Sequence, residues 1–110
     1  MVKQGGKVFE LELNGMPLGG LRSATYQEVA LKLQTGDVVV FFSDGVTESP
    51  SAADPDKLYM ETDRLFSLIA GFDEQMTAQA MIDAILADVA DFSGGRNQSD
   101  DRTVVIIKVL

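Results

Sequence analysis

An apolar run that ends on a carboxylate is the feature of this sequence that most constrains its fold. Residues Val38–Phe42 read Val-Val-Val-Phe-Phe and pass directly into Ser-Asp-Gly. Such a run predicts a strand, and the lack of alternation with polar residues favours a strand covered on both faces. Thr103–Val109 is a second, nearly continuous apolar run, and Asp100 and Asp101 precede it. The sequence thus predicts two buried strands, each with acidic residues at one end.

The remaining segments predict two half-exposed strands and two helices. Apolar and polar residues alternate in Lys7–Leu13 and Tyr26–Leu33, as they do in strands with one face in water. The Gln-Thr-Gly-Asp segment at 34–37 has the composition of a tight turn between antiparallel strands. Helical periodicity begins near Thr62 and again near Thr77. We therefore expect an α+β fold in which two helices pack on one face of an antiparallel sheet.

Signals for the helix ends and a connecting loop are also present. Thr62 or Asp63 can cap the first helix, and Gly71 can end it. Residues 48–58 hold two of the three prolines and predict a surface loop. The second helix should run to about Phe92, with a core-facing stripe at spacings of three and four. This stripe consists of Met81, Ile82, Ile85, Leu86, Val89 and Phe92.

Composition excludes several kinds of site. The chain of 110 residues contains no Cys and no His, so any metal must be held by oxygen ligands, which favours magnesium, manganese or calcium. The net charge of −8 disfavours binding to nucleic acid or to an anionic membrane. The N-terminus lacks the apolar region of a signal peptide, and no apolar run is long enough to span a bilayer. We expect a cytoplasmic protein, or a cytoplasmic part of a longer one.

The acids beside the two apolar runs predict one shared site. If the two strands are antiparallel neighbours, Asp44 after the first run lies beside Asp100 and Asp101 before the second, with paired residues about 5 Å apart. Carboxylates at that separation repel unless a cation lies between them or one is protonated. We therefore expect a divalent-metal site, although the residues alone do not choose between Asp100 and Asp101. Gly45 would let the chain turn sharply and let a carbonyl or water approach the ion.

Other interpretations of these residues stay open. Asp-Gly is a common turn dipeptide, and the Ser-Asp-Asp-Arg-Thr segment can be a polar loop whose side chains bond to nearby backbone. The acids would then be structural, and the chain a non-catalytic interaction module. A single-site calcium-binding domain is a further alternative, although only two or three acids converge.

Two segments resemble a known family. The chain is similar to the C-terminal half of the SpoIIE/RsbU-type branch of metal-dependent (PPM) serine/threonine protein phosphatases. The similarity lies in the segment GMPLGGLRSATYQEVALKLQTGDVVVFFSDGVTES, in the helical pair that follows it, and in the segment GGRNQSDDRTVVIIKV. The resemblance extends from about Met16 to Val109. Residues 1–110 are accordingly expected to be the C-terminal portion of a single PPM-type phosphatase domain.

The resemblance implies a hydrolase with a β-sandwich whose rim holds two Mn²⁺ or Mg²⁺ ions. A water between the ions would attack a phosphoserine or phosphothreonine. Asp44 and Asp100 match metal ligands of the family, whereas Asp101 matches a position that more often supports the ligands. Gly45 and Thr103 match positions that shape the site. The implied partner is a phosphorylated anti-sigma-factor antagonist in a signalling pathway that regulates a sigma factor.

The chain also departs from the family pattern. A further metal-binding Asp motif and a Gly-His-Asn-Pro-Pro-like segment precede the matching part in the family, and this sequence contains neither. We therefore expect it to begin partway through the domain and to have little phosphatase activity alone. Tyr59-Met60 replaces a frequent Phe-Gly, which predicts a different loop beside the site. Half a sandwich leaves an apolar sheet face and strand edges open, which predicts a homodimer or strand exchange.

Overall fold

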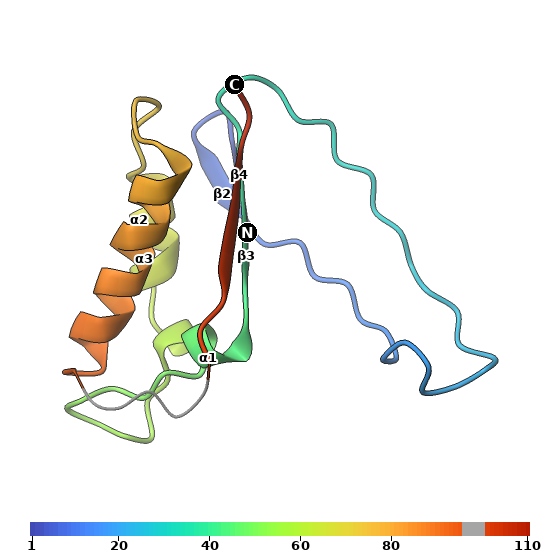
Figure 1. Cartoon of the computed structure of the whole chain (residues 1–110), viewed down its shortest axis with the longest axis horizontal. Helices are drawn as coiled ribbons and strands as arrows, with labels where there is room; N and C mark the ends of the chain where they lie inside the picture. Colours follow the sequence, from blue (N-terminus) through green and yellow to red (C-terminus); the bar gives the residue numbers. More distant parts are fainter. Residues whose placement is uncertain (96–100) are drawn as a thin grey trace.

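The computed structural model describes residues 1–95 and 101–110. Within these residues, the strands form one antiparallel sheet of order β2-β1-β3-β4. The helices lie together on one side of this sheet, as Figure 1 shows, so the α+β fold expected from the sequence is confirmed. The strands are β1 (Val2–Gln4), β2 (Lys7–Phe9), β3 (Val38–Phe42) and β4 (Val104–Lys108), and the helical elements are α1 (Asp44–Thr47), the 3₁₀ helix η1 (Tyr59–Glu61), α2 (Arg64–Ala70) and α3 (Ala78–Phe92).

The central pair of strands has the orientation that the shared site requires. β3 and β4 are antiparallel over five residue pairs, from Val38 opposite Lys108 to Phe42 opposite Val104. The end of β3 therefore lies beside the start of β4. These two strands are far apart in the chain, and we infer from the sequence that they are antiparallel neighbours in the sheet. The observed pairing confirms this inference.

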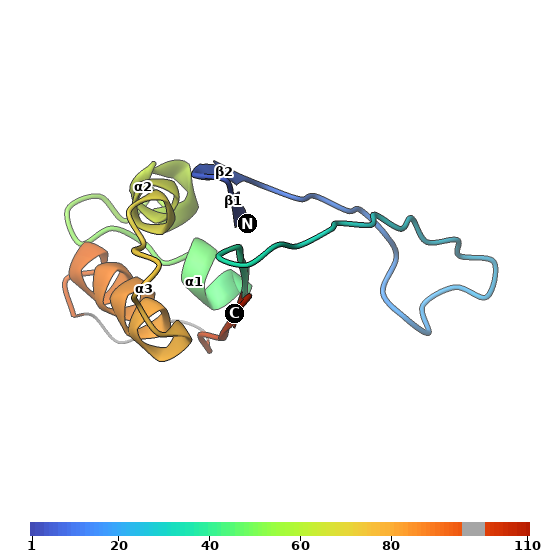
Figure 2. The same ribbon diagram turned by 90° about the horizontal axis from the view of Figure 1, so that it is seen from above.

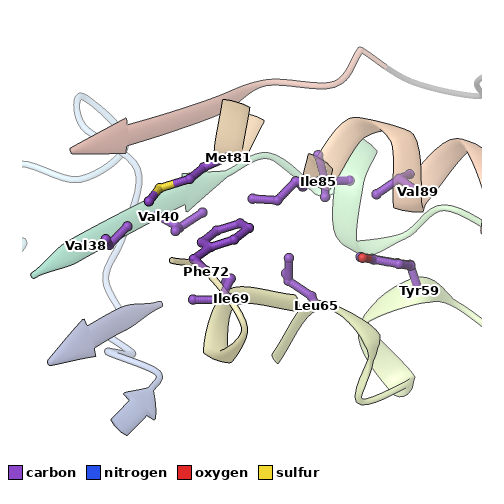
Figure 3. Packing of buried hydrophobic residues seen from close by; sticks show 10 residues of the cluster. Val38, Val40, Tyr59, Leu65, Ile69, Phe72, Met81, Ile85 and Val89 are labelled. Carbon is purple, nitrogen blue, oxygen red and sulfur yellow. The ribbon is translucent and has the colours of Figure 1, made fainter. Parts of the chain in front are cut away.

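The hydrophobic core lies between the sheet and the helices. Val38 and Val40 point from β3 toward the helices, where Ile85 of α3 is fully buried (Figure 3). Met81, Ile85 and Val89 lie one helical turn apart on α3 and are the buried centre of its predicted stripe. The buried apolar cluster consists of Val38, Val40, Val46, Tyr59, Leu65, Ile69, Phe72, Met81, Ile85 and Val89.

The prediction that β3 is covered on both faces is wrong for this chain. Successive side chains of a strand point to opposite faces, and the helices cover only one of them. Phe41 on β3 is consequently 55% exposed, and Val105 and Ile107 on β4 are 50% and 46% exposed. The expectation of an open apolar sheet face is confirmed. We call Phe41, Val105 and Ile107 the open face.

Residues 10–35 form a long arm that leaves the body of the molecule and returns (Figures 1 and 2). The first strand predicted there ends at Phe9 rather than Leu13, and Tyr26–Leu33 is not a strand at all. Both departures have one cause, because a strand needs a hydrogen-bonded neighbour, and among the described residues neither part of the arm has a strand beside it. The base of the arm is tied down where the Gln4 side chain donates to the Lys32 carbonyl at 2.8 Å.

The turn at residues 34–37 is confirmed, but it joins the arm to β3 rather than two strands. The Asp37 N–H donates to the Gln34 carbonyl at 3.0 Å. The Asp37 carboxylate is buried, and it accepts hydrogen bonds from the Gln34 N–H and the Gln4 side chain, both at 2.8 Å.

The helix ends follow the sequence closely. α2 begins after Asp63, the Thr62 hydroxyl accepts a hydrogen bond from the Arg64 N–H at 3.3 Å, and Gly71 follows the last residue of the helix. Thr77 caps α3 by accepting from the Ala80 N–H at 3.1 Å. No helix in the described part of the chain is long and apolar enough to cross a membrane.

Candidate metal centre

The one-turn helix α1 carries the first of the predicted metal ligands. β3 ends at Phe42, Ser43 follows in an extended conformation, and Asp44 is the first residue of α1. The Asp44 side chain is exposed, whereas Gly45 and Val46 are buried. The expected sharp turn at Asp-Gly is therefore a helical turn, and Gly45 has no positive φ.

Ser43 joins the end of β3 to the segment that precedes β4. Its N–H donates to the Thr103 carbonyl at 3.0 Å, and its hydroxyl oxygen accepts from the Thr103 N–H at 2.9 Å. The same hydroxyl donates to the Asp101 carbonyl at 3.2 Å. These three bonds extend the pairing of the two strands past the end of the ladder. They hold the backbone of Asp101 beside the start of α1.

Gly45 permits the closest approach at this rim. A Cβ atom at position 45 would lie 1.9 Å from the carbonyl oxygen of Asp101 and 2.7 Å from its carbonyl carbon. Any side chain other than hydrogen would push α1 and the Asp101 segment apart. From the sequence, Gly45 is expected to allow a sharp turn and the approach of an ion, and the latter stays a prediction. The structure adds a further role, which is the close packing of two backbone segments.

The predicted site residues divide into those that the structure describes and one that it does not. Asp44 and Asp101 are both exposed on the rim where β3 ends and β4 begins. Thr103 contributes its backbone N–H and carbonyl to Ser43, and so shapes this rim. Asp100 lies outside the described residues. The assignment of Asp44, Asp100 and Asp101 as metal ligands therefore stays a prediction.

The donor chemistry of the rim suits a hard cation, but the described ligands are few. Carboxylate oxygens are the preferred ligands of Mg²⁺, Mn²⁺ and Ca²⁺, and the sequence has neither His nor Cys to offer. In residues 1–95 and 101–110, no group of three or more acidic side chains is close enough to hold an ion. Mg²⁺ takes about six oxygen ligands. Asp44 and Asp101 would therefore supply only a part of a complete coordination shell.

A support beneath α1 was not found from the sequence. The buried Ser49 hydroxyl donates to the Gly45 carbonyl at 2.8 Å, and the Ser49 carbonyl accepts from the Tyr59 N–H at 2.9 Å. Tyr59 is fully buried, and its hydroxyl points toward α3 and donates to Asp88 Oδ2 at 2.5 Å. Tyr59, where the sequence departs from the pattern of the family it resembles, is thus anchored both to Asp88 and to the segment that follows α1. Its position immediately after a loop rich in polar residues was the only available signal.

An ion-pair cluster surrounds Asp88, the residue to which the Tyr59 hydroxyl is bonded. Arg64 donates from Nε and Nη2 to the two oxygens of Asp88 at 3.2 and 2.7 Å, and from Nη2 to Asp91 at 2.9 Å. The hydrogen bond from Arg64 lowers the pKa of the Asp88 carboxyl. Burial, reinforced by the hydrogen bond to Asp88, raises the pKa of the Tyr59 hydroxyl. The Tyr59 and Phe92 rings meet edge to face with centroids 5.4 Å apart. The contacts of Arg64, Asp88 and Tyr59 therefore join α2, α3 and η1.

Solved structures identify the fold. The chain superimposes on the phosphatase domain of the cell fate determinant SpoIIE from Bacillus subtilis with a TM-score of 0.67 and 22% identity, over 98% of this chain and 46% of that domain. A manganese-presoaked structure of that domain gives a TM-score of 0.66, 22% identity and coverage of 98% and 44%. A crystal form of it without domain swapping gives 0.61, 24%, 96% and 43%. The fold is that of part of a SpoIIE phosphatase domain.

Sequence comparison identifies the family. The model of the Stage II sporulation protein E (SpoIIE) family matches residues 1–110, and the chain belongs to this family. It is 26% identical over 108 residues to the Stage II sporulation protein E of Bacillus subtilis (strain 168), which covers 98% of this chain. The chain spans 12% of the length of that curated relative and less than half of each solved domain.

Proposed function

We propose that this chain forms the C-terminal portion of a metal-dependent protein serine/threonine phosphatase domain, with its metal site on the β3–β4 rim. The observation that carries the proposal is the antiparallel pairing of β3 with β4, which brings the residues after one strand against those before the other. Membership of the SpoIIE family and the likeness to its phosphatase domain support the hydrolase chemistry. The manganese presoak of that domain supports Mn²⁺ or Mg²⁺ as the cofactor.

In this proposal the acidic residues of the rim have different roles in binding the cation. The carboxylates of Asp44 and Asp100 bind the cation, and Asp101 assists from the adjacent position. Gly45 and Thr103 keep the two backbone segments in contact, which places the backbone of Asp101 beside the helical turn that carries Asp44. A bound divalent cation would activate water and neutralise charge on the phosphoryl oxygens.

The proposed substrate is a phosphorylated protein of the anti-sigma-factor antagonist type, met in the cytoplasm. The net charge of −8 supports a protein rather than a nucleic acid as partner. The proposed cation would offset the repulsion between the acidic rim and a phosphoryl group.

One observation favours a second candidate function. The described rim holds only two of the predicted carboxylates, and the affinity of an oxygen site for a divalent cation depends strongly on the number of its ligands. If Asp44 and Asp101 bind no cation, the acids are structural and the chain is a non-catalytic interaction module. The two candidates differ in whether Asp44 binds a cation.

The test is a titration of the chain with Mn²⁺, in which binding is monitored by the paramagnetic broadening of backbone amide NMR signals. We expect broadening centred on the amides of residues 43–46, with a dissociation constant in the millimolar range typical of a site with few ligands. Asp44→Asn should abolish it. Glu74→Gln is the matched control, because Glu74 is an exposed carboxylate beside Gly36, at the opposite end of β3. Equal broadening in the wild-type and Asp44→Asn chains would support the interaction module instead.

A further inference from the structure

The helix that presents Asp44 is too short to be stable by itself. α1 has four residues, and an isolated helix of one turn does not form in water, because nucleation costs more than its few hydrogen bonds return. Its direction must therefore be set by contacts with the rest of the chain. One such contact, between Gly45 and the Asp101 backbone, lies on the side facing β4. On the side of the helices, the Val46 side chain packs in the core, and a hydrogen bond gives α1 a second contact.

Ser49 provides that second contact. Its side chain is buried, and its hydroxyl donates to the Gly45 carbonyl at 2.8 Å, four residues back along the chain. The bond closes the turn just after α1, where the Glu48 N–H already donates to the Asp44 carbonyl at 2.8 Å. Because Ser49 bonds to the residue that follows Asp44, its hydroxyl restrains the backbone from which the Asp44 carboxylate extends.

Ser49 is itself fixed to the body of the molecule through Tyr59. The Tyr59 N–H donates to the Ser49 carbonyl at 2.9 Å, and the Thr62 hydroxyl donates to the Tyr59 carbonyl at 2.7 Å. The Tyr59 hydroxyl binds Asp88 on α3, and its ring packs in the core beside Val89 and Leu65 (Figure 3). A continuous series of contacts thus runs from α3 through Tyr59 and Ser49 to α1.

We propose that Ser49 is a positioning residue for the cation-binding carboxylate of Asp44, and that Tyr59 anchors Ser49 to the helical layer. This inference rests on the proposed function, because it assigns Asp44 to the cation. Loss of the Ser49 hydroxyl leaves the core side chains in place and releases only the restraint on α1. The orientation of the Asp44 carboxylate then varies more, and a cation must order it on binding, which lowers affinity.

The test compares two serines that make the same kind of bond. Ser93 is also buried, and its hydroxyl donates to the Val89 carbonyl, again four residues back, at 3.0 Å at the end of α3. Ser49→Ala and Ser93→Ala therefore each remove a buried bond from a serine hydroxyl to the carbonyl four residues back, and Ser93→Ala also removes a longer bond of 3.3 Å to the Ala90 carbonyl. Only the first should raise the Mn²⁺ dissociation constant, by about threefold to tenfold, the effect expected from one buried hydrogen bond. Ser49→Thr keeps the hydroxyl and should restore affinity.

A second measurement does not depend on the metal. Hydrogen exchange at the Glu48 amide, whose bond to the Asp44 carbonyl closes α1, should be about threefold to tenfold faster in Ser49→Ala and unchanged in Ser93→Ala. Unchanged exchange at Glu48 in Ser49→Ala would overturn the positioning role. If exchange changes while Asp44→Asn binds Mn²⁺ as the wild type does, the proposed function fails and Ser49 positions α1 for another purpose. The two failures are thereby distinguished.

Discussion

The backbone of Asp101 lies directly against Gly45, so close that a Cβ atom at position 45 would be 1.9 Å from the Asp101 carbonyl oxygen. This contact joins two segments that the sequence separates by more than half of the chain. It brings the residues before β4 onto the helical turn that carries Asp44. The first prediction concerns this contact.

Gly45→Ala should destabilise the chain by about 3 kcal/mol, because the new methyl group meets backbone atoms that cannot move aside as a flexible side chain can. Urea unfolding followed by circular dichroism measures the change. Gly71→Ala is the control, since a Cβ there would meet its nearest atoms, the Leu68 and Ser67 carbonyl oxygens, at an ordinary 3.6 Å. A loss at Gly45 no larger than the loss at Gly71 would contradict the close packing of α1 on the Asp101 segment.

Tyr59→Phe should lower the free energy of unfolding by about 1.5–3 kcal/mol, the usual contribution of a hydrogen bond to a charged group. The substitution keeps the ring in the core and its edge-to-face contact with Phe92, and removes only the hydroxyl bond to Asp88. The same urea titration measures it. Phe92→Leu is a useful comparison, because it removes the ring contact and leaves the hydroxyl bond. If the urea midpoint of Tyr59→Phe equals that of the wild type, the Tyr59 hydroxyl does not anchor η1 to α3.

The stability of the chain should fall in acid partly because of Asp88. The hydrogen bond from Arg64 lowers the pKa of this carboxyl in the folded state. A lowered pKa gives a stabilising contribution that is complete above the pKa of the unfolded chain and is lost as pH falls through the folded-state pKa. The urea midpoint of Asp88→Asn should therefore decrease less than that of the wild type between neutral pH and pH 3.

The control for that pH dependence is Asp83→Asn. Asp83 is exposed on the same helix, and its side chain accepts a hydrogen bond from the Gln79 amide at 2.9 Å rather than from a cation. Removal of the Asp83 carboxylate should leave the acid-induced loss of stability close to that of the wild type. Identical pH profiles for Asp88→Asn and the wild type would show that the Arg64–Asp88 pair does not contribute to stability.

The elements that the sequence predicted correctly are those whose pattern is self-contained. α3 follows from an apolar stripe at helical spacing, and Thr77 caps it in the structure as a threonine before such a stripe should. β3 and β4 follow from runs of β-branched and aromatic residues, and the antiparallel pairing on which the shared site was conditional is present.

The elements that the sequence missed or wrongly predicted depend on residues outside their own segments. Tyr26–Leu33 alternates like a strand, but without a neighbouring strand the backbone hydrogen bonds of a ladder cannot form. α1 is too short to show periodicity, and its Asp-Gly start matches a turn equally well. Ser49 and Tyr59 gain their importance only from partners distant in the sequence. For the candidate site, the sequence indicated the acids, whose binding of a cation stays a prediction, and missed Ser49 and Tyr59.

The last prediction concerns the open face. Phe41, Val105 and Ile107 form an apolar surface on β3 and β4, and water-exposed apolar area of this kind favours association. We propose that a second copy of the chain covers it. Light scattering should then give the mass of a dimer, with a monomer appearing on dilution. Phe41→Thr should shift the equilibrium toward the monomer, since threonine keeps the preference for a strand and removes the ring. Phe66→Thr is the control, because Phe66 is 45% exposed but lies on α2, away from the sheet surface. A monomeric mass for the wild-type chain at high concentration would contradict self-association, as would an equal shift from both variants.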